Sequence, residues 1–271
     1  MKKNRIKRKF ETLKKRGEKG FIAYISAGDP SLEDTVDIVL RLEDAGVDLV
    51  ELGLPFSDPL ADGHVNQEAA ARALAAGSTF DGVMKCVKKI REQSEIPMIF
   101  YAYMNTLLPR GFNVSIQQAA EAGIDGFLLL DLPVEEAAPY RAALKENHLD
   151  AIQLITPTTP DERIEKIVKR ASGFVYCVSR EGVTGVQQQL ATGAGDLVQR
   201  IKAHTPLPVA LGFGIGTPEQ AASAAKLSDA IVVGSAIVNA FHHQSHTPKG
   251  RDCAAQFVKK MVRATKKKHV S

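Results

Sequence analysis

Residues 51–63, ELGLPFSDPLADG, place three carboxylates and two prolines directly after an apolar run. The apolar run predicts a buried strand, so Glu51 is expected at the end of that strand, largely out of water. Desolvation favours the neutral form of a carboxyl group and raises its pKa, which suits a general acid or base near neutral pH. Glu51 is therefore a candidate catalytic residue, and a buried ion pair is the alternative role for its side chain.

Asp62 lies later in the same segment, on a loop that contains Pro55 and Pro59. Proline fixes the backbone φ angle, so the carboxylates of this loop have little freedom of position. Asp62 is therefore a second candidate catalytic carboxylate. For Asp58, a residue type that is common in turns, we favour an ordinary turn or helix-capping role.

Two glycine-containing turns late in the chain have the composition of an anion site. The segments GFGIGTPEQ (212–220) and VVGSA (232–236) each end an apolar run with small residues and then begin a helical pattern. Small residues allow a ligand to approach the backbone, and helix N-termini attract anions. The glycine spacing matches neither the G-x-G-x-x-G dinucleotide fingerprint nor the Walker loop. We therefore expect a phosphate site here, with ordinary tight turns as the alternative.

The segment SREGVTG (179–185) contains two glycines and continues into a polar stretch. This composition, close to the two phosphate turns in the expected fold, predicts a lid that closes over the site. Arg180 has two alternative roles, contact with phosphate or simple exposure to solvent, of which the second is commoner. Thr184 is placed to orient a catalytic carboxylate by hydrogen bonding.

The elements that must position these residues form a regular series of eight apolar runs separated by helical patterns. The runs are continuous rather than alternating, which is typical of parallel strands covered on both faces. They predict an α/β fold, a closed (β/α)8 TIM barrel with extra helices before the first strand and after Asp62; a doubly wound open sheet is the alternative. The predicted strands are 21–26, 48–53, 97–103, 126–132, 151–156, 174–179, 208–214 and 229–235.

A barrel would bring the candidate residues together, because its active site lies at the C-terminal ends of the strands. The loops after the seventh and eighth strands are the usual phosphate site of this architecture. No change of composition marks an internal linker, so residues 1–271 are expected to form a single barrel domain.

Composition excludes several classes of protein. The net charge is only +4 and much of it lies at the two ends, without the motif or the interleaved aromatics of a nucleic-acid-binding protein. No stretch approaches the roughly 20 apolar residues that span a bilayer, and no secretory signal is evident. We therefore expect neither a nucleic-acid nor a membrane partner.

The histidines and cysteines predict no metal site and no disulfide framework. Cys86, Cys177 and Cys253 are scattered, and the first two lie in apolar surroundings as small buried side chains would. No cysteine or carboxylate completes the tract His242-His243-x-x-His246, so a metal site is not expected there. A reducing, cytoplasmic location fits this cysteine usage best.

Taken together, the motifs resemble the α subunit family of tryptophan synthase. Several segments that look unrelated to each other match at once and in the right order, from about Phe21 to Val238. The matching segments are FIAYISAGDPS (21–31), ELGLPFSDPLADG (51–63), DLPVEE (131–136), SREGVTG (179–185), GFGI (212–215) and GSAIV (234–238).

The resemblance implies a retro-aldol cleavage of indole-3-glycerol phosphate to indole and glyceraldehyde 3-phosphate, without a metal or organic cofactor in this chain. Glu51 and Asp62 match the family's catalytic positions. Glu51 would move protons at indole C3 and the C3′ hydroxyl, while Asp62 stays ionised and accepts the indole N–H. By the same resemblance, Tyr103, Tyr176 and Thr184 are expected to bind substrate, and Gly185, Gly214, Gly234 and Ser235 its phosphate.

The resemblance also implies a partner chain, the β subunit of tryptophan synthase, in an α2β2 heterotetramer. The β subunit condenses the released indole with serine to give L-tryptophan. Its pyridoxal phosphate is expected in the partner alone. The segments expected to face the β subunit are residues 56–62 and 131–136.

One departure from the family pattern lies beside Asp62. The family usually continues ADG with proline and has isoleucine before the glutamine, whereas this chain has His64 and Asn66. The change is expected to loosen or re-aim the loop of Asp62. A second hypothesis is therefore a barrel that has lost useful activity and serves mainly to activate a β partner. A third hypothesis is another phosphate-binding barrel enzyme, such as an isomerase of the same pathway, against which the combined motifs argue.

Overall fold

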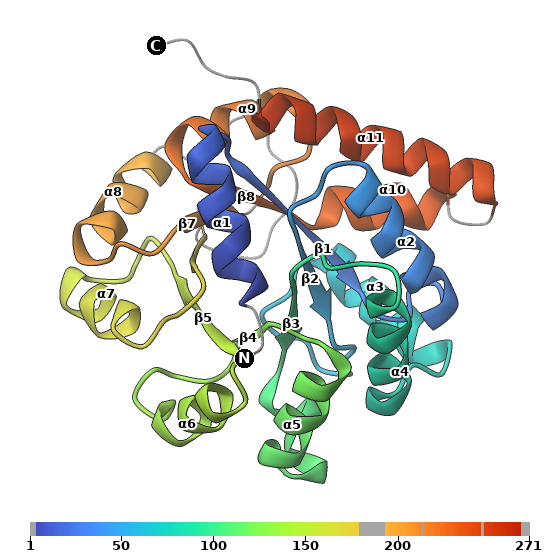
Figure 1. Ribbon diagram of the computed structural model, residues 1–271, viewed down its shortest axis with the longest axis horizontal. Helices are drawn as coiled ribbons and strands as arrows, with labels where there is room; N and C mark the ends of the chain where they lie inside the picture. The colour runs from blue at the N-terminus through green and yellow to red at the C-terminus, as the bar shows by residue number, and fades with distance from the viewer. Residues whose placement is uncertain (1–3, 179–192, 213, 245–246, 267–271) are drawn as a thin grey trace.

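A computed structural model describes residues 4–178, 193–212, 214–244 and 247–266. In these ranges eight parallel strands form a closed barrel in sequence order, with β8 paired to β1 (Figure 1). The TIM-barrel prediction is confirmed, and the open-sheet alternative is wrong. The strands are β1 (Gly20–Ser26), β2 (Leu49–Gly53), β3 (Met98–Ala102), β4 (Gly126–Leu129), β5 (Asp150–Ile155), β6 (Val175–Val178), β7 (Val209–Gly212) and β8 (Ala230–Val233).

Helices surround this barrel (Figure 1), and three of the α-helices in the described ranges are additions to the simple alternation of strand and helix, since two helices follow β8. As predicted, one extra helix precedes β1 and another follows Asp62. No helix in the described ranges is long and apolar enough to cross a membrane. The α-helices are α1 (Arg5–Arg16), α2 (Leu32–Asp44), α3 (His64–Ala75), α4 (Phe80–Arg91), α5 (Phe112–Ala122), α6 (Ala138–Glu146), α7 (Asp161–Val168), α8 (Ala194–His204), α9 (Pro218–Leu227), α10 (Ser235–Gln244) and α11 (Pro248–Lys266), and the short 3₁₀ helices are η1 (Met104–Thr106) and η2 (Leu108–Arg110).

The strands are buried on both faces, which explains their continuous apolar sequences. Successive side chains of a strand point to opposite faces, so each strand contributes to two cores. In β2, Leu49 belongs to the cluster inside the barrel, whereas Val50 and Leu52 belong to the larger cluster between barrel and helices. Glu51 has the same parity as Leu49 and therefore points to the barrel interior.

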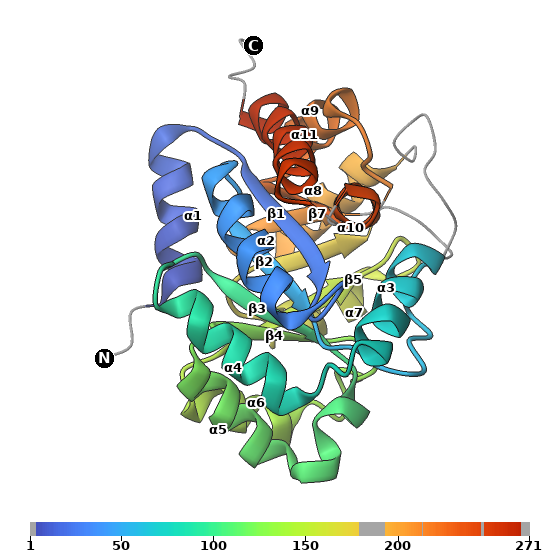
Figure 2. The ribbon, with the colours of Figure 1, turned by 90° about the vertical axis from the view of Figure 1, so that its right-hand side faces the viewer.

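Helix α1 covers the N-terminal end of the barrel. Ile6 is fully buried in the interior cluster, and the ring of Phe10 lies 5.8 Å from that of Phe174. Figure 2 shows α1 and α3 at opposite ends of the strands. The end of the barrel beside α3 is therefore the one available for a site.

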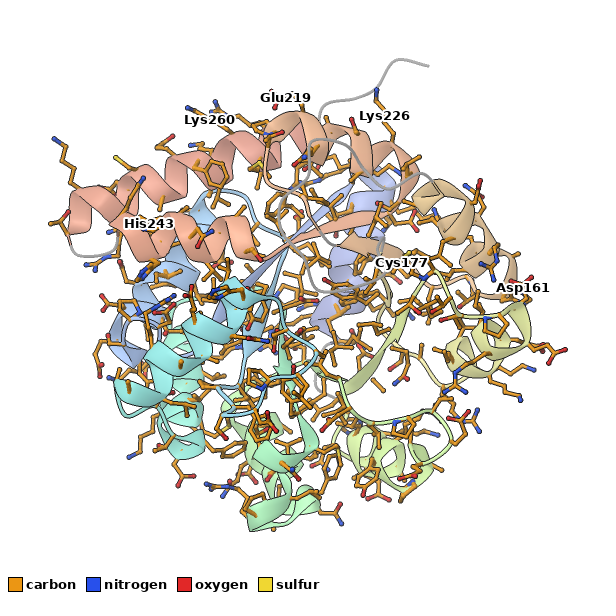
Figure 3. All side chains as sticks on the ribbon, turned by 180° about the vertical axis from the view of Figure 1, so that it is seen from behind. Asp161, Cys177, Glu219, Lys226, His243 and Lys260 are labelled. Atoms are coloured by element: carbon orange, nitrogen blue, oxygen red, sulfur yellow. The ribbon has the colours of Figure 1, made fainter. Side chains whose placement is uncertain are left out.

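The cysteines occupy the environments that the sequence predicted. Cys86 and Cys177 are buried, and burial raises the pKa of both thiols to about 12. In Figure 3, Cys177 lies toward the interior, whereas Lys226 and Lys260 lie at the outer edge of the molecule. The two buried thiols therefore remain protonated and act as small core side chains.

Asp125 connects α1, α4 and β3 below the barrel. Its carboxylate accepts hydrogen bonds from Arg5 at 2.9 Å, from Arg91 at 3.0 Å and from the backbone N–H of Met98 at 2.9 Å. The Asp125 side chain is only 7% exposed, so these partners replace the water that it loses on folding.

We expect Asp125→Ala to lower the free energy of unfolding by about 3–5 kcal/mol, because it leaves the largely buried Arg91 without its carboxylate. Urea denaturation followed by circular dichroism would measure the loss. Asp81→Ala is the matched control, since Asp81 meets Arg110 at the surface and should contribute about 1 kcal/mol or less. Equal losses in the two variants would contradict the prediction.

Candidate active site

A pocket opens at the C-terminal ends of the strands and collects most of the residues that the sequence analysis selected. Of these, Glu51, Asp62, Tyr176, Gly214, Gly234 and Ser235 line it, and Tyr103 adjoins it through Asp62. Thr184 and Gly185, like the rest of the predicted lid, lie outside the described residues. The full lining is Tyr24, Glu51, Ala61, Asp62, Gly63, His64, Val65, Asn66, Tyr101, Tyr176, Gly214, Ile215, Val232, Gly234, Ser235, Ala236 and Asn239.

Glu51 is a buried carboxyl group without a compensating charge in the described part of the chain. Glu51 lies in the middle of β2 and not at its end as predicted, because the strand continues to Gly53, and the residue is 1% exposed. Oε1 has no hydrogen-bond partner there, and no cation forms an ion pair with it, so the alternative of a buried ion pair finds no support in those residues. Burial raises the pKa of Glu51 to about 8. The group is therefore mostly protonated at neutral pH and has a proton to donate.

Asp62 is also buried, but hydrogen-bond donors surround its carboxylate. The hydroxyl of Tyr103 donates to Oδ2 at 2.8 Å, and that of Tyr101 donates to Oδ1 at 2.9 Å. Burial raises the pKa of Asp62 above its ordinary value, while hydrogen bonds from Tyr103, Tyr101 and Asn66 act in the opposite direction. The two carboxyl groups of the pocket thus differ, since Oε1 of the protonated Glu51 has no hydrogen-bond partner in the described residues, whereas hydrogen bonds favour the anionic form of Asp62 against its burial.

The loop that carries Asp62 is tied to β3 and to α3. The backbone N–H of Ala61 donates to the Tyr103 hydroxyl at 3.0 Å, and the Gln67 side chain donates to the Asp62 carbonyl at 2.8 Å. His64, which stands where the family has proline, is the first residue of α3, and its side chain is 82% exposed. Loss of the proline therefore leaves the start of the helix intact.

Tyrosine rings form walls of the pocket, and glycines at strand ends make room for them. A Cβ atom on Gly53 would lie 2.6 Å from the Tyr24 hydroxyl, and one on Gly212 would clash with the Tyr176 hydroxyl. Tyr24 and Tyr101 meet edge to face, with ring centroids 4.9 Å apart. Flat aromatic faces of this kind suit a planar apolar ring.

The opposite side of the pocket has the features of an anion site. Gly214 follows β7 with φ +75°, a conformation that favours glycine. Gly234 and Ser235 join β8 to α10, so the first N–H groups of α10 lie at the pocket. Such groups have no partner within the helix and attract phosphate oxygens.

The sequence analysis did not select Tyr24 or Tyr101 as pocket residues. It noted Asn66 only as a departure from the family pattern, although Asn66 also lines the pocket. A signal for both tyrosines was present. Tyr101 lies two residues before Tyr103 and therefore has the same strand parity, and Tyr24 is the register partner of Glu51. What the sequence did not give was the path of the loop that brings Asp62 to them.

The described residues contain no group of three His, Cys, Asp or Glu side chains placed to hold a metal ion. His246, the last histidine of the His242 tract, lies outside the described ranges.

Comparison with known proteins gives a consistent result. The family model described as "Tryptophan synthase alpha chain" matches residues 10–268. The chain is similar to the tryptophan synthase alpha chains of Opitutus terrae, with 45% identity over 91% of this chain and 92% of that protein, and of Carboxydothermus hydrogenoformans, with 43% identity over 97% and 98%.

Solved structures agree in fold. The tryptophan synthase subunit alpha of Legionella pneumophila is 37% identical with a TM-score of 0.87, covering 97% of this chain and 98% of that one. A chain of M. tuberculosis tryptophan synthase in its aminoacrylate-bound form is 28% identical with a TM-score of 0.86, covering 97% and 100%. The hypothesis of a different phosphate-binding barrel enzyme is therefore wrong. The chain belongs to the tryptophan synthase alpha chain family, the lyase subunit that cleaves indole-3-glycerol phosphate in tryptophan synthesis.

Proposed function

We propose that Glu51 and Asp62 carry out this cleavage as an acid/base group and an electrostatic partner. The observation that carries the proposal is the difference between two buried carboxyl groups of one pocket. Glu51 has a pKa raised to about 8 and an Oε1 without a hydrogen-bond partner among the described residues, whereas the Asp62 carboxylate accepts hydrogen bonds from two tyrosine hydroxyls. Groups whose environments differ in this way take different roles.

Glu51 would act twice in one turnover. Its carboxyl proton passes to indole C3, which makes the ring a cationic indolenine. The resulting carboxylate then removes the proton of the C3′ hydroxyl. The O–H electron pair forms the aldehyde C=O, and the pair of the C3–C3′ bond returns to the ring, which neutralises it. Glu51 is protonated again at the end, and a positioned acid/base of this kind contributes roughly 10²–10⁴ in rate.

Asp62 would accept the indole N–H and stabilise the positive charge that the first proton transfer creates. A carboxylate held in place before the reaction needs no reorganisation at the moment when charge develops. The aromatic walls formed by Tyr24, Tyr101 and Tyr176 would orient the ring. In this proposal Tyr103 acts on the substrate indirectly, by holding the Asp62 carboxylate with its hydroxyl. Thr184 remains a predicted substrate contact in the lid.

The phosphate is proposed to lie against Gly214, Gly234 and Ser235, with Gly185 of the lid as a further predicted contact. Support comes from the N-terminus of α10 and from the absence of side chains at the two described glycines. Binding energy gained at this remote group would help to orient the bond that breaks.

Gly234→Asp is expected to raise KM for indole-3-glycerol phosphate by about 100-fold or more, because a carboxylate would face the phosphate at short range. Gly234→Ala is the matched control. A Cβ atom there would meet Tyr24 at 3.5 Å, an ordinary contact, so KM should change by less than about tenfold. Steady-state kinetics of indole release measures both. An unchanged KM in Gly234→Asp would show that the phosphate does not bind at this turn.

The family implies a β subunit as partner, and we infer an α2β2 heterotetramer in the cytoplasm. Indole is apolar, so direct transfer between subunits would prevent its loss to solvent. Residues 56–62 and 131–136 are the proposed contact segments, and within the first of them Leu60 is 79% exposed. Pyridoxal phosphate is assigned to the partner, and residues 1–271 are proposed to form one domain.

Indole release from indole-3-glycerol phosphate by the purified chain, with and without a tryptophan synthase β subunit, tests the proposal. Slow turnover that rises strongly with the partner is the expected result. The second candidate function, activation of a β subunit by an inactive barrel, rests on His64 and Asn66. Absence of turnover in both conditions, together with activation of the β reaction, would support that candidate and reject the first.

A further inference from the structure

Both oxygens of the Asp62 carboxylate are held by tyrosine hydroxyls that come from the same stretch of chain. Tyr101 donates to Oδ1 at 2.9 Å and Tyr103 donates to Oδ2 at 2.8 Å. The family resemblance assigned a place in the site to Tyr103 but none to Tyr101. With a donor on one oxygen only, a carboxylate still turns about its Cβ–Cγ bond, because that rotation is soft. With donors on both oxygens, its plane is determined.

We propose that Tyr101 is a positioning residue of this site, which holds Oδ1 of Asp62 and thereby determines, together with Tyr103, the plane in which the carboxylate meets the indole N–H. The inference rests on the function proposed above for Asp62. A carboxylate offers about four acceptor positions, so the two hydroxyls and the Asn66 side chain still leave a position for the substrate. With its plane fixed, the Asp62 carboxylate would present its free acceptor positions to the pocket.

Tyr101 is itself held firmly. It belongs to β3, where Gly53 of β2 is its register partner, and its ring packs edge to face against Tyr24 at 4.9 Å. Burial and the nearby Asp62 charge raise the pKa of Tyr101 well above its ordinary value. The hydroxyl therefore keeps its proton and remains a donor across the whole working pH range.

Hydrogen bonds to the charged form favour it, so the Tyr101 hydroxyl should also extend the ionised range of Asp62 toward lower pH. In the described part of the chain, no cation is among the groups that shift the pKa of Asp62, and the donors are what oppose its burial. Among the described residues, the titratable groups that face Asp62 or line the pocket beside it are Tyr24 of β1, Glu51 of β2, His64 of α3, Tyr101 of β3, Tyr103 after β3 and Tyr176 of β6.

Tyr101→Phe tests the proposal, because it keeps the ring and removes only the hydroxyl. The pH dependence of kcat/KM reports the free enzyme, and its acid limb should follow the ionisation of Asp62. Without the Tyr101 donor this limb should move up by about one to two pH units. Activity is then lost mainly on the acid side, which a merely structural role for Tyr101 would not produce. Tyr101→Leu, which also lacks the hydroxyl, should show the same shift.

Tyr24→Phe is the matched control, since Tyr24 packs against the Tyr101 ring, whereas among the described residues the hydroxyls that donate to the Asp62 carboxylate are those of Tyr101 and Tyr103. Its acid limb should stay in place. A second readout is independent of activity: ¹³C NMR of the Asp62 carboxyl in the free protein, assigned with Asp62→Asn. The parent protein could lack turnover while Tyr101→Phe still shifts the pKa of Asp62 in the NMR titration. That result would reject the proposed function but support the role of Tyr101 in holding Asp62. An acid limb and a titration that both stay unmoved in Tyr101→Phe would overturn the inference.

Discussion

Glu51→Gln is expected to lower kcat for indole-3-glycerol phosphate cleavage by about 10²–10⁴-fold. Glutamine has nearly the shape of the buried, neutral glutamic acid, but it has no proton to give to indole C3 and no carboxylate to accept one from the C3′ hydroxyl. Indole release under saturating substrate measures the loss. In the parent chain, kcat/KM should fall as pH rises through about 8, because Glu51 then loses the proton that the first step needs.

The same substitution should stabilise the fold at neutral pH. The folded-state pKa of Glu51 is raised to about 8 from an ordinary 4.5, so the folded chain keeps a proton that the unfolded chain releases above pH 4.5. Stability associated with this group is fully present below pH 4.5 and is lost as pH rises through 8. The loss is about 3 kcal/mol at pH 7, and glutamine, which does not titrate, avoids it.

Urea denaturation at pH 4 and pH 7 checks this second effect, with a gain expected at pH 7 only. Glu92→Gln is a suitable control, because Glu92 is exposed at the end of α4 and should change neither turnover nor the pH dependence of stability. Turnover that survives in Glu51→Gln would show that another group moves the protons.

Asp62→Asn is expected to lower kcat by about 10²–10³-fold. The amide preserves the volume of the side chain but removes the negative charge that faces the cationic ring. It also presents one N–H₂ group where two tyrosine hydroxyls and the indole N–H require acceptors. The acid limb of the pH profile should disappear with the carboxylate, so kcat/KM against pH distinguishes this loss from general misfolding.

Asp58→Asn provides the control from the same loop. Asp58 is exposed, and in the isolated chain its substitution should leave cleavage within about twofold of the parent. Normal turnover in Asp62→Asn would mean that hydrogen bonding, rather than charge, is what this position supplies. Circular dichroism of both variants should match that of the parent.

Much of the fold and part of the site could be predicted from the sequence. Largely apolar strands such as β1 (Gly20–Ser26) and β2 (Leu49–Gly53) predicted burial on both faces and hence a parallel barrel, because the hydrophobic pattern of a strand is a local property. The position of Glu51 after an apolar run predicted its desolvation for the same reason. The glycines at the ends of β7 and β8 predicted turns that a phosphate can approach.

The tertiary structure alone decided how these groups act on each other. That Glu51 lacks a partner among the described residues depends on what the other strands bring to the pocket. That Tyr101 reaches Asp62 depends on a loop folding back over β3 across 39 positions of sequence. The pattern of a strand specifies which face a side chain points to. A pKa or a hydrogen bond depends on every neighbour in space, and closure of the barrel determines which residues become neighbours.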